Sequence, residues 1–219
     1  MTKPFKVLKI NPDSLVSAHL VEIVSCLKKG GLLGFPTETV YGLGGLATVR
    51  VRRRLQRLKK RESARPIGLF VSSISQVRKI ASEIPSYADR LMKCFWPGPL
   101  TLVFPSSNRS LRPLLHQGTI GIRIPQQKWL LTVLRRLGRP LLQTSANLSG
   151  QSPARTSGEV QRLFGDRLNL IIDAGRLKKT KPSTVVDVTG PVPIILRKGL
   201  LSPRELERAL NMKVHVAHP

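Results

Sequence analysis

Three separated segments of this chain combine hydroxyl groups, fixed positive charge and small polar side chains. Residues 36–44 (Pro-Thr-Glu-Thr-Val-Tyr-Gly-Leu-Gly) are dense in hydroxyls, residues 59–61 (Lys-Lys-Arg) supply cations, and residues 145–150 (Ser-Ala-Asn-Leu-Ser-Gly) form a short polar loop. Arginine offers a planar fork of donors and lysine a point charge, so the two together suit an anion with several oxygens. The pattern predicts a site for a polyanionic small molecule, such as a nucleoside triphosphate.

Each of these segments also has a simpler interpretation. Thr37, Thr39 and Tyr41 alternate along an expected extended turn, which would place three hydroxyls on one side. Local side-chain to backbone hydrogen bonds in a polar loop would explain them as well. Eight of the twelve residues from Arg50 to Arg61 are Lys or Arg, so most must be solvated, and composition does not single out Lys59 and Arg61. Residues 145–150 could equally be a helix cap and turn.

Two further arginines lie where a charge is expensive. Arg123 falls within the expected strand 119–124, and Arg197 ends the expected strand 194–197. A charge in such a strand needs an acidic residue or a bound anion to offset its desolvation. Ser183 and Thr184 stand at the start of a third expected strand.

The remaining composition excludes several classes of chemistry and suggests partners. The four histidines and two cysteines show no metal-ligand spacing, and no Walker loop or dinucleotide fingerprint is present, so no protein-held metal is expected. The chain carries 37 Lys and Arg against 12 Asp and Glu, a formal charge of +25. This favours anionic partners, although a genome-wide bias toward basic residues is an alternative. We expect weak, non-specific RNA binding through residues 50–57 and Lys178, Lys179 and Lys181.

The hydrophobic pattern predicts helices that alternate with short strands. No signal peptide and no membrane-length apolar run is evident, so a cytoplasmic protein is expected. Residues 36–45 are expected to form a turn. Helices are expected at 12–29, 50–59, 73–80, 87–95, 129–137, 159–164 and from 203; strands at 32–35, 67–71, 100–104, 119–124, 141–144, 170–173, 184–188 and 194–197. The fold class is therefore α/β, as a single domain with a twisted mixed β-sheet flanked by helices.

Several motifs together resemble one known family. Residues 34–44, Lys59-x-Arg61, the Trp-Pro-Gly-Pro-Leu-Thr segment at 96–101 and the loop at 145–150 occur in the order and spacing of YrdC-like proteins, the threonylcarbamoyl-AMP synthases. The resemblance runs from about Leu32 to about Gly199. It implies one YrdC-like domain over residues 1–219, with a core at about 14–210, a concave basic cavity and no additional C-terminal domain.

The resemblance also implies a reaction. ATP, L-threonine and bicarbonate would give L-threonylcarbamoyladenylate and pyrophosphate, for the N6-threonylcarbamoyladenosine modification of tRNA by a downstream transferase. Mg²⁺ would arrive with ATP. The implied catalytic residues are Lys59, Arg61, Ser145 and Asn147, which with Ser183 and Arg197 would also contact the nucleotide; Thr37, Tyr41 and Arg123 would contact threonine.

Two other functions remain open from the sequence. A non-catalytic RNA-binding protein could use the same basic cavity, but aromatic residues are only 5% of the chain, which disfavours base stacking. Another carbamoyl-adenylate-forming enzyme, as in a domain of the hydrogenase maturation carbamoyltransferases, is the third candidate.

Overall fold

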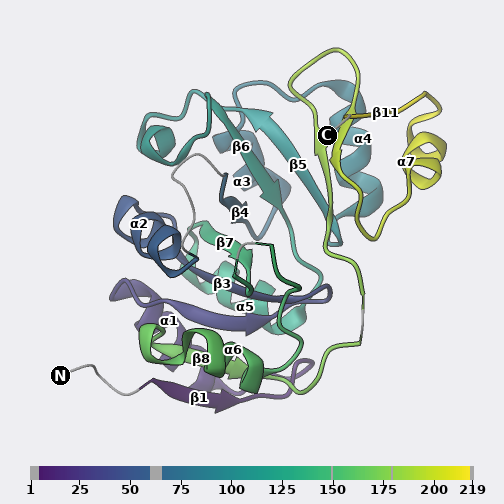
Figure 1. The fold of residues 1–219 in the computed structure, drawn as a ribbon. Helices are drawn as coiled ribbons and strands as arrows, with labels where there is room; N and C mark the ends of the chain where they lie inside the picture. Colours follow the sequence, from purple (N-terminus) through teal and green to yellow (C-terminus); the bar gives the residue numbers. More distant parts are fainter. Residues whose placement is uncertain (1–4, 60–65, 149, 179, 218–219) are drawn as a thin grey trace.

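The computed structural model describes residues 5–59, 66–148, 150–178 and 180–217, which form one twisted sheet with helices packed against it (Figure 1). The strands are β1 Lys6–Lys9, β2 Leu33–Pro36, β3 Tyr41–Leu46, β4 Gly68–Phe70, β5 Leu100–Pro105, β6 Thr119–Arg123, β7 Leu141–Ser145, β8 Leu170–Asp173, β9 Thr184–Asp187, β10 Ile194–Arg197 and β11 His215–Val216. The α-helices are α1 Ser17–Lys28, α2 Val49–Leu58, α3 Ile74–Ile80, α4 Ser86–Phe95, α5 Lys128–Leu137, α6 Ser157–Phe164 and α7 Pro203–Leu210; two short 3-10 helices are η1 Arg109–Leu114 and η2 Gly165–Arg167.

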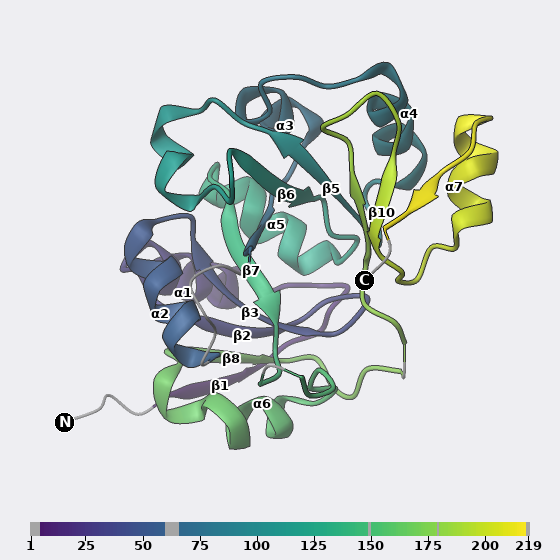
Figure 2. The same cartoon turned by 45° about the horizontal axis from the view of Figure 1, so that its top comes forward.

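The sheet is mixed, as the alternating pattern predicted. Its strand order is β1-β8-β2-β3-β7-β4-β6-β5-β9-β10-β11. Some neighbouring strands are antiparallel (β2 with β3, β3 with β7) and others are parallel (β4 with β6, β5 with β9). Figure 2 shows β7 between two groups of strands, with β2 and β3 on one side of it and β5 and β6 on the other. Side chains from both groups can therefore converge near β7.

The basic helix α2 illustrates how the sequence fixes an element that leads into the site. The Thr48 hydroxyl caps it by accepting a hydrogen bond from the Val51 amide at 3.3 Å. Val51, Leu55 and Leu58 are buried at helical spacing. The helix ends at Lys59, which is its C-cap residue. The expected amphipathic helix is confirmed, and it delivers the Lys59 side chain to the end of β7.

Residues 36–45 are not all turn, which corrects the prediction. The turn is confined to Thr37–Val40, where the Thr37 amide donates to the Val40 carbonyl oxygen at 3.2 Å. Tyr41 already begins β3, which forms a hairpin with β2. A Cβ atom on Gly44 would lie 2.5 Å from the Leu142 carbonyl oxygen and 2.9 Å from the Phe35 ring. This glycine therefore serves close packing in the sheet, a role that its turn propensity concealed.

The start of the first helix was also predicted wrongly. Helix α1 begins at Ser17, because the Asn11 side chain accepts a hydrogen bond from the Asp13 amide at 2.9 Å and forms a separate turn. The periodic apolar residues that define the helix start only at Leu20. Its end before Gly30, which has φ +77°, is as predicted.

The packed region extends beyond the predicted limits of 14–210. Strand β1 pairs in parallel with β8, and Leu8 and Ile10 are buried. At the other end Val214 is buried, and β11 pairs with β10. Neither strand was expected, because each is short and exposes most of its side chains. Within the described residues, no helix has the length and apolar character needed to cross a membrane.

Candidate active site

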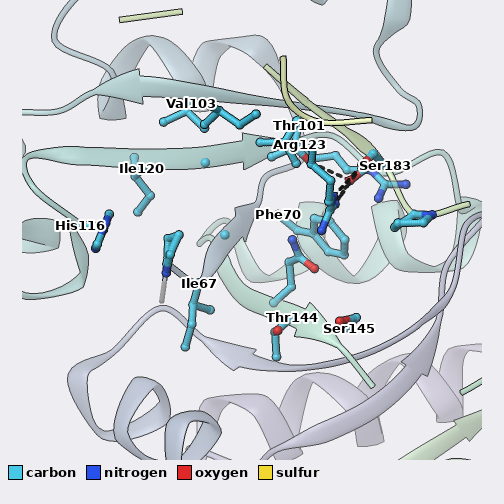
Figure 3. A pocket seen from close by; sticks show the side chains of 18 of the residues that line it. Ile67, Phe70, Thr101, Val103, His116, Ile120, Arg123, Thr144, Ser145 and Ser183 are labelled. Atoms are coloured by element: carbon cyan, nitrogen blue, oxygen red, sulfur yellow. Dashed lines mark hydrogen bonds between the residues drawn. The ribbon is translucent and has the colours of Figure 1, made fainter. Parts of the chain in front are cut away.

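A cavity of about 550 Å³ opens on the sheet around β7, within the size range of small-molecule sites (Figure 3). Its wall has two chemically different ends. Arg123, Thr101 and Ser183 gather at one end, and Ile67, Ile120 and His116 lie at the other, with Thr144 and Ser145 below them in the view of Figure 3. The end with hydroxyls and cations therefore suits a polar part of a ligand. The other end suits an apolar or aromatic part.

Arg123 is the most constrained cation of this wall. Arg123 is the last residue of β6 and is 3% exposed. The guanidinium forms an ion pair with Glu38, and its Nε donates to the Gly98 carbonyl oxygen at 2.9 Å. It also lies over the Phe70 ring, 5.5 Å from the centroid. Burial lowers the Arg123 pKa and the nearby Glu38 charge raises it. The sequence analysis expected Arg123 to need an acidic residue or a bound anion, and Glu38 is that acidic residue.

The Thr37–Val40 turn places two hydroxyls on the cavity wall. The Thr37 and Thr39 hydroxyls are 2.9 Å apart, and Thr37 donates to the Val40 carbonyl oxygen at 2.7 Å. Both residues line the cavity. The Thr37 oxygen also accepts from the Thr39 and Val40 amides at 3.1 and 3.2 Å, so local bonds hold these hydroxyls in position.

Tyr41 does not join the two threonines, contrary to the alternation argument. Among the described residues that line the cavity Tyr41 is missing, and its side chain is fully buried. Its hydroxyl donates to the Gly175 carbonyl oxygen at 3.1 Å, and burial raises its pKa to about 12. The chain reversal at Thr37–Val40 breaks the period of two that the prediction assumed. Its predicted contact with threonine is thus unsupported by this geometry.

Lys59, Ser145 and Asn147 form one hydrogen-bonded network at the exit of β7. Lys59 is only 1% exposed. Its ammonium donates to the Ser145 carbonyl oxygen at 2.6 Å and to Asn147 Oδ1 at 3.0 Å, and it lies 3.3 Å from the Ser145 hydroxyl. The Ser145 hydroxyl donates to the same Asn147 oxygen at 2.5 Å. Three residues that are distant in sequence are therefore held as a unit, with Ser145 on the cavity wall.

Asn147 is the residue that organises this network. Its amide nitrogen donates to the carbonyl oxygens of Leu148 and Gln151, both at 2.8 Å. This fixes which end of the amide faces Lys59 and Ser145. The loop after β7 is therefore a turn held by local hydrogen bonds, as one interpretation of the sequence had it. The same bonds also position Ser145, which lines the cavity.

Ser183 and Arg197 meet at the polar end of the cavity. Arg197 Nη2 donates to the Ser183 carbonyl oxygen at 2.8 Å and to its hydroxyl at 3.1 Å. The Ser183 hydroxyl is also 2.9 Å from that of Thr101. Both Ser183 and Arg197 line the cavity. The predicted pair thus sits on the same wall as Arg123, although Ser183 immediately precedes β9 and Arg197 ends β10.

The structure brings most of the predicted site residues together and adds others. Thr37, Arg123, Ser145, Ser183 and Arg197 line the cavity, and Lys59 and Asn147 join it through Ser145. Arg61 and Ser149 lie outside the described residues. The sequence analysis assigned no role to several polar residues at the site, among them Glu38, Thr101, Gln143 and Asp187. The change from two leucines to a glutamine within the expected strand 141–144 was the available signal for Gln143.

The charge of the wall is more mixed than a basic cavity implies. Among the described lining residues, the cations are Arg123 and Arg197, and Asp187 is an anion. No group of three or more His, Cys, Asp or Glu side chains in the described chain is placed to hold a metal ion. A divalent ion at this cavity would therefore have to bring most of its ligands with it.

Comparisons with known proteins agree with this fold. The family Sua5_yciO_yrdC, described as "Telomere recombination", matches residues 25–199. A threonylcarbamoyl-AMP synthase of Pyrococcus abyssi is 36% identical over 196 residues, 87% of this chain. The crystal structure of P. abyssi Sua5 complexed with L-threonine superposes with a TM-score of 0.89 at 32% identity, covering 95% of this chain and 62% of that one. Escherichia coli YciO gives a TM-score of 0.85 at 27% identity, covering 92% of this chain and 99% of that one.

These likenesses confirm the predicted α/β fold with a mixed sheet. They also set a limit, because the chain spans only 57% of the length of the P. abyssi synthase. The family is shown over most of this chain, while the activity of the longer relative is not carried over with it.

Proposed function

This chain belongs to the Sua5/YciO/YrdC family, and from that membership we propose that it is a threonylcarbamoyl-AMP synthase. Its substrates are ATP, L-threonine and bicarbonate, and its products are L-threonylcarbamoyladenylate and pyrophosphate. The product then serves N6-threonylcarbamoyladenosine formation in tRNA by a separate transferase. We propose a cytoplasmic location for the enzyme.

One observation carries the proposal: a cation suited to a carboxylate and groups suited to phosphates share one cavity. Arg123 and the Thr37 and Thr39 hydroxyls suit the carboxylate and hydroxyl of threonine. The binding of L-threonine to a relative that shares this fold supports that assignment. Ser183 with Arg197 and Ser145 with Lys59 suit the phosphates of a nucleotide.

The first step of the proposed reaction makes a carbamate. The threonine amine, after it loses a proton, adds to the carbon of carbon dioxide derived from bicarbonate. Arg123 holds the threonine carboxylate, so the amine is presented to the open part of the cavity. Fixing the two reactants in one orientation replaces an encounter in solution.

The second step transfers the adenylyl group. A carbamate oxygen forms a bond to the α-phosphorus of ATP while the bond from that phosphorus to the leaving pyrophosphate breaks. Negative charge grows on the phosphoryl and pyrophosphate oxygens, and Lys59, Arg61 and Arg197 are the proposed cations that stabilise it. Asn147 acts as a positioning residue, because its Oδ1 fixes both Lys59 and Ser145.

Mg²⁺ enters the proposal as part of the substrate. Asp187 is the carboxylate among the described lining residues, and one carboxylate is too few for a protein cage of Mg²⁺. The ion would be bound by the ATP phosphates and would neutralise the leaving pyrophosphate.

Pyrophosphate release tests the proposal directly. Purified protein is incubated with MgATP, and L-threonine and bicarbonate are omitted in turn. We expect release only when both are present, with threonylcarbamoyladenylate detected by mass spectrometry. Release that is indifferent to threonine would contradict the synthase and favour another carbamoyl-adenylate-forming enzyme.

Weak RNA binding is a second proposed property, favoured by the outer face of α2. Arg50, Arg53 and Arg57 are exposed on it at helical spacing. Phosphate contacts by such side chains need no base recognition. This binding would keep the enzyme near tRNA without taking part in the reaction.

A further inference from the structure

The ion pair between Glu38 and Arg123 has an unusual position, because it occupies the cation proposed to receive the substrate carboxylate. Arg123 is 3% exposed and lines the cavity, while the Glu38 side chain is 17% exposed. Two residues 85 positions apart in sequence thus place an anion beside the binding cation before any ligand arrives.

Neither partner uses all its hydrogen-bonding capacity. A guanidinium has five N–H donors. Those of Arg123 serve the Gly98 carbonyl oxygen, the Thr39 hydroxyl and Glu38, so two have no partner among the described residues. Glu38 Oε2 is buried and likewise has no hydrogen-bond partner within the described chain. A buried carboxylate oxygen without a partner is costly. Glu38 is not among the described residues that line the cavity, so it acts on a ligand at Arg123 through its charge.

The charges of the pair discriminate between ligands. A carboxylate that binds the remaining Arg123 donors brings a second negative charge close to Glu38, and like charges a few ångströms apart in a desolvated site repel strongly. A zwitterion brings its own positive charge as well. Its ammonium group offsets the second negative charge and restores neutrality beside the ion pair.

We propose that Glu38 is a specificity-determining residue, which makes the Arg123 end of the cavity select α-amino acid zwitterions over carboxylates that lack an ammonium group. The inference rests on the proposed function, since it assumes that threonine binds at Arg123. MgATP and bicarbonate are both anions and would compete for Arg123. Repulsion by Glu38 would disfavour them there and leave Arg123 to the amino acid.

A purely structural role for Glu38 makes a different prediction. If Glu38 only holds Arg123 in place, its loss weakens every ligand at Arg123 by a similar factor. If Glu38 sets specificity, its loss weakens ligands that carry an ammonium group and strengthens those that carry only a carboxylate. The direction of change for an anionic ligand therefore separates the two roles.

The experiment is calorimetric binding of three related ligands to the full chain. They are L-threonine, (R)-3-hydroxybutanoate, which lacks the ammonium group, and (R)-1-amino-2-propanol, which lacks the carboxylate. Glu38→Gln removes the charge but keeps an oxygen for Arg123. Asp89→Asn is the matched control, because Asp89 pairs with Arg78 and Lys93 on the surface, away from the cavity.

In the wild type and in Asp89→Asn we expect threonine to bind more tightly than either analogue. In Glu38→Gln we expect weaker threonine binding and tighter hydroxybutanoate binding. The ratio of the two dissociation constants should change by about tenfold or more, the size expected for one close charge.

Parallel weakening of threonine and hydroxybutanoate in Glu38→Gln, or an unchanged ratio, would overturn the inference. Failure of the wild type to bind threonine would instead count against the proposed function. A wild type that binds hydroxybutanoate as well as threonine would preserve threonine as a ligand while refuting selection by Glu38.

Discussion

Arg123 and Lys59 are two buried cations beside one cavity, and the fold supports them in different ways. Arg123 is held by residues from separate parts of the chain: the Glu38 carboxylate, the Gly98 carbonyl oxygen and the Phe70 ring. The described partners of Lys59 come from one short segment at the end of β7, where Ser145 and Asn147 supply its acceptors. The first cation is tuned by a neighbouring charge, and the second is aimed by a preformed loop.

The difference indicates a division of labour. A fixed fork with an internal counterion suits recognition of a ligand whose charges must match it. A lysine whose described acceptors are the oxygens of a preformed loop suits stabilisation of charge that develops during the reaction. Substitution of Arg123 should therefore affect threonine binding most, and substitution of Lys59 should affect turnover most.

The largest expected effect is that of Lys59→Ala. We expect turnover in the pyrophosphate assay to fall by about a hundredfold, because a charge-assisted contact contributes roughly 1.5–3 kcal/mol. Arg61→Ala should behave similarly. Arg53→Ala is the control, since Arg53 is exposed on the same helix. Arg54 is unsuitable, because it donates to the Gly30 carbonyl oxygen at 2.7 Å. Equal losses for Lys59→Ala and Arg53→Ala would mean that the positive charges of the helix act together on the substrate, and that Lys59 makes no specific contact.

Arg123→Lys should have the next largest effect. Lysine keeps the charge but lacks the planar fork, so it cannot satisfy Gly98 and Glu38 and also present donors to a ligand. We expect the KM for threonine to rise about tenfold or more, while the KM for ATP changes little. Steady-state kinetics with each substrate varied would measure this, with Arg136→Lys on the exposed face of α5 as the control. A loss confined to kcat would contradict the division between the two cations.

Tyr41→Phe should have a smaller effect, of the size of one neutral hydrogen bond, about 0.5–1.5 kcal/mol. The lost bond anchors Gly175, which precedes the segment that leads to Ser183. We expect activity to fall by less than about tenfold, through the KM for ATP. A specific rise in the KM for threonine would restore the direct contact predicted from the sequence.

The same variant gives a test by pH. The Tyr41 pKa is raised from 10.0 to about 12 in the folded chain, mainly by burial. The unfolded chain therefore loses this proton first, and the Tyr41 contribution to stability is lost as pH rises from about 10 to about 12. The stability difference between wild type and Tyr41→Phe, measured by denaturant unfolding, should shrink or reverse over this interval and be constant below it.

The sequence predicted the strands and loops of the site better than it predicted their contacts. Lys59, Ser145 and Asn147 could be found because short motifs with distinctive residue types mark them. The partner of Arg123 could not, since Glu38 lies 85 residues away and only the folded sheet joins them. Tyr41 was placed wrongly because a period-of-two argument holds within a strand and fails across the turn before it. Strand β1 escaped detection, because four residues with one buried side chain carry no periodic signal.

Solvent-exposed arginines complete the comparison with the two buried cations. Their substitution should have the smallest effect on activity. Arg50, Arg53 and Arg57 lie on the outer face of α2, and a triple change to Gln should leave pyrophosphate release unchanged. RNA binding, measured by filter titration at several salt concentrations, should weaken and become less dependent on salt. Each lost phosphate contact removes about 0.7–0.9 from the slope of log affinity against log salt.

A matched triple change at Arg135, Arg136 and Arg139, near the end of α5, controls for net charge. Equal weakening by both triples would show that overall charge, and no particular face, attracts RNA. Binding that is insensitive to salt or strongly selective for tRNA would contradict a solvated, non-specific surface, and would favour RNA recognition as a main function of the chain.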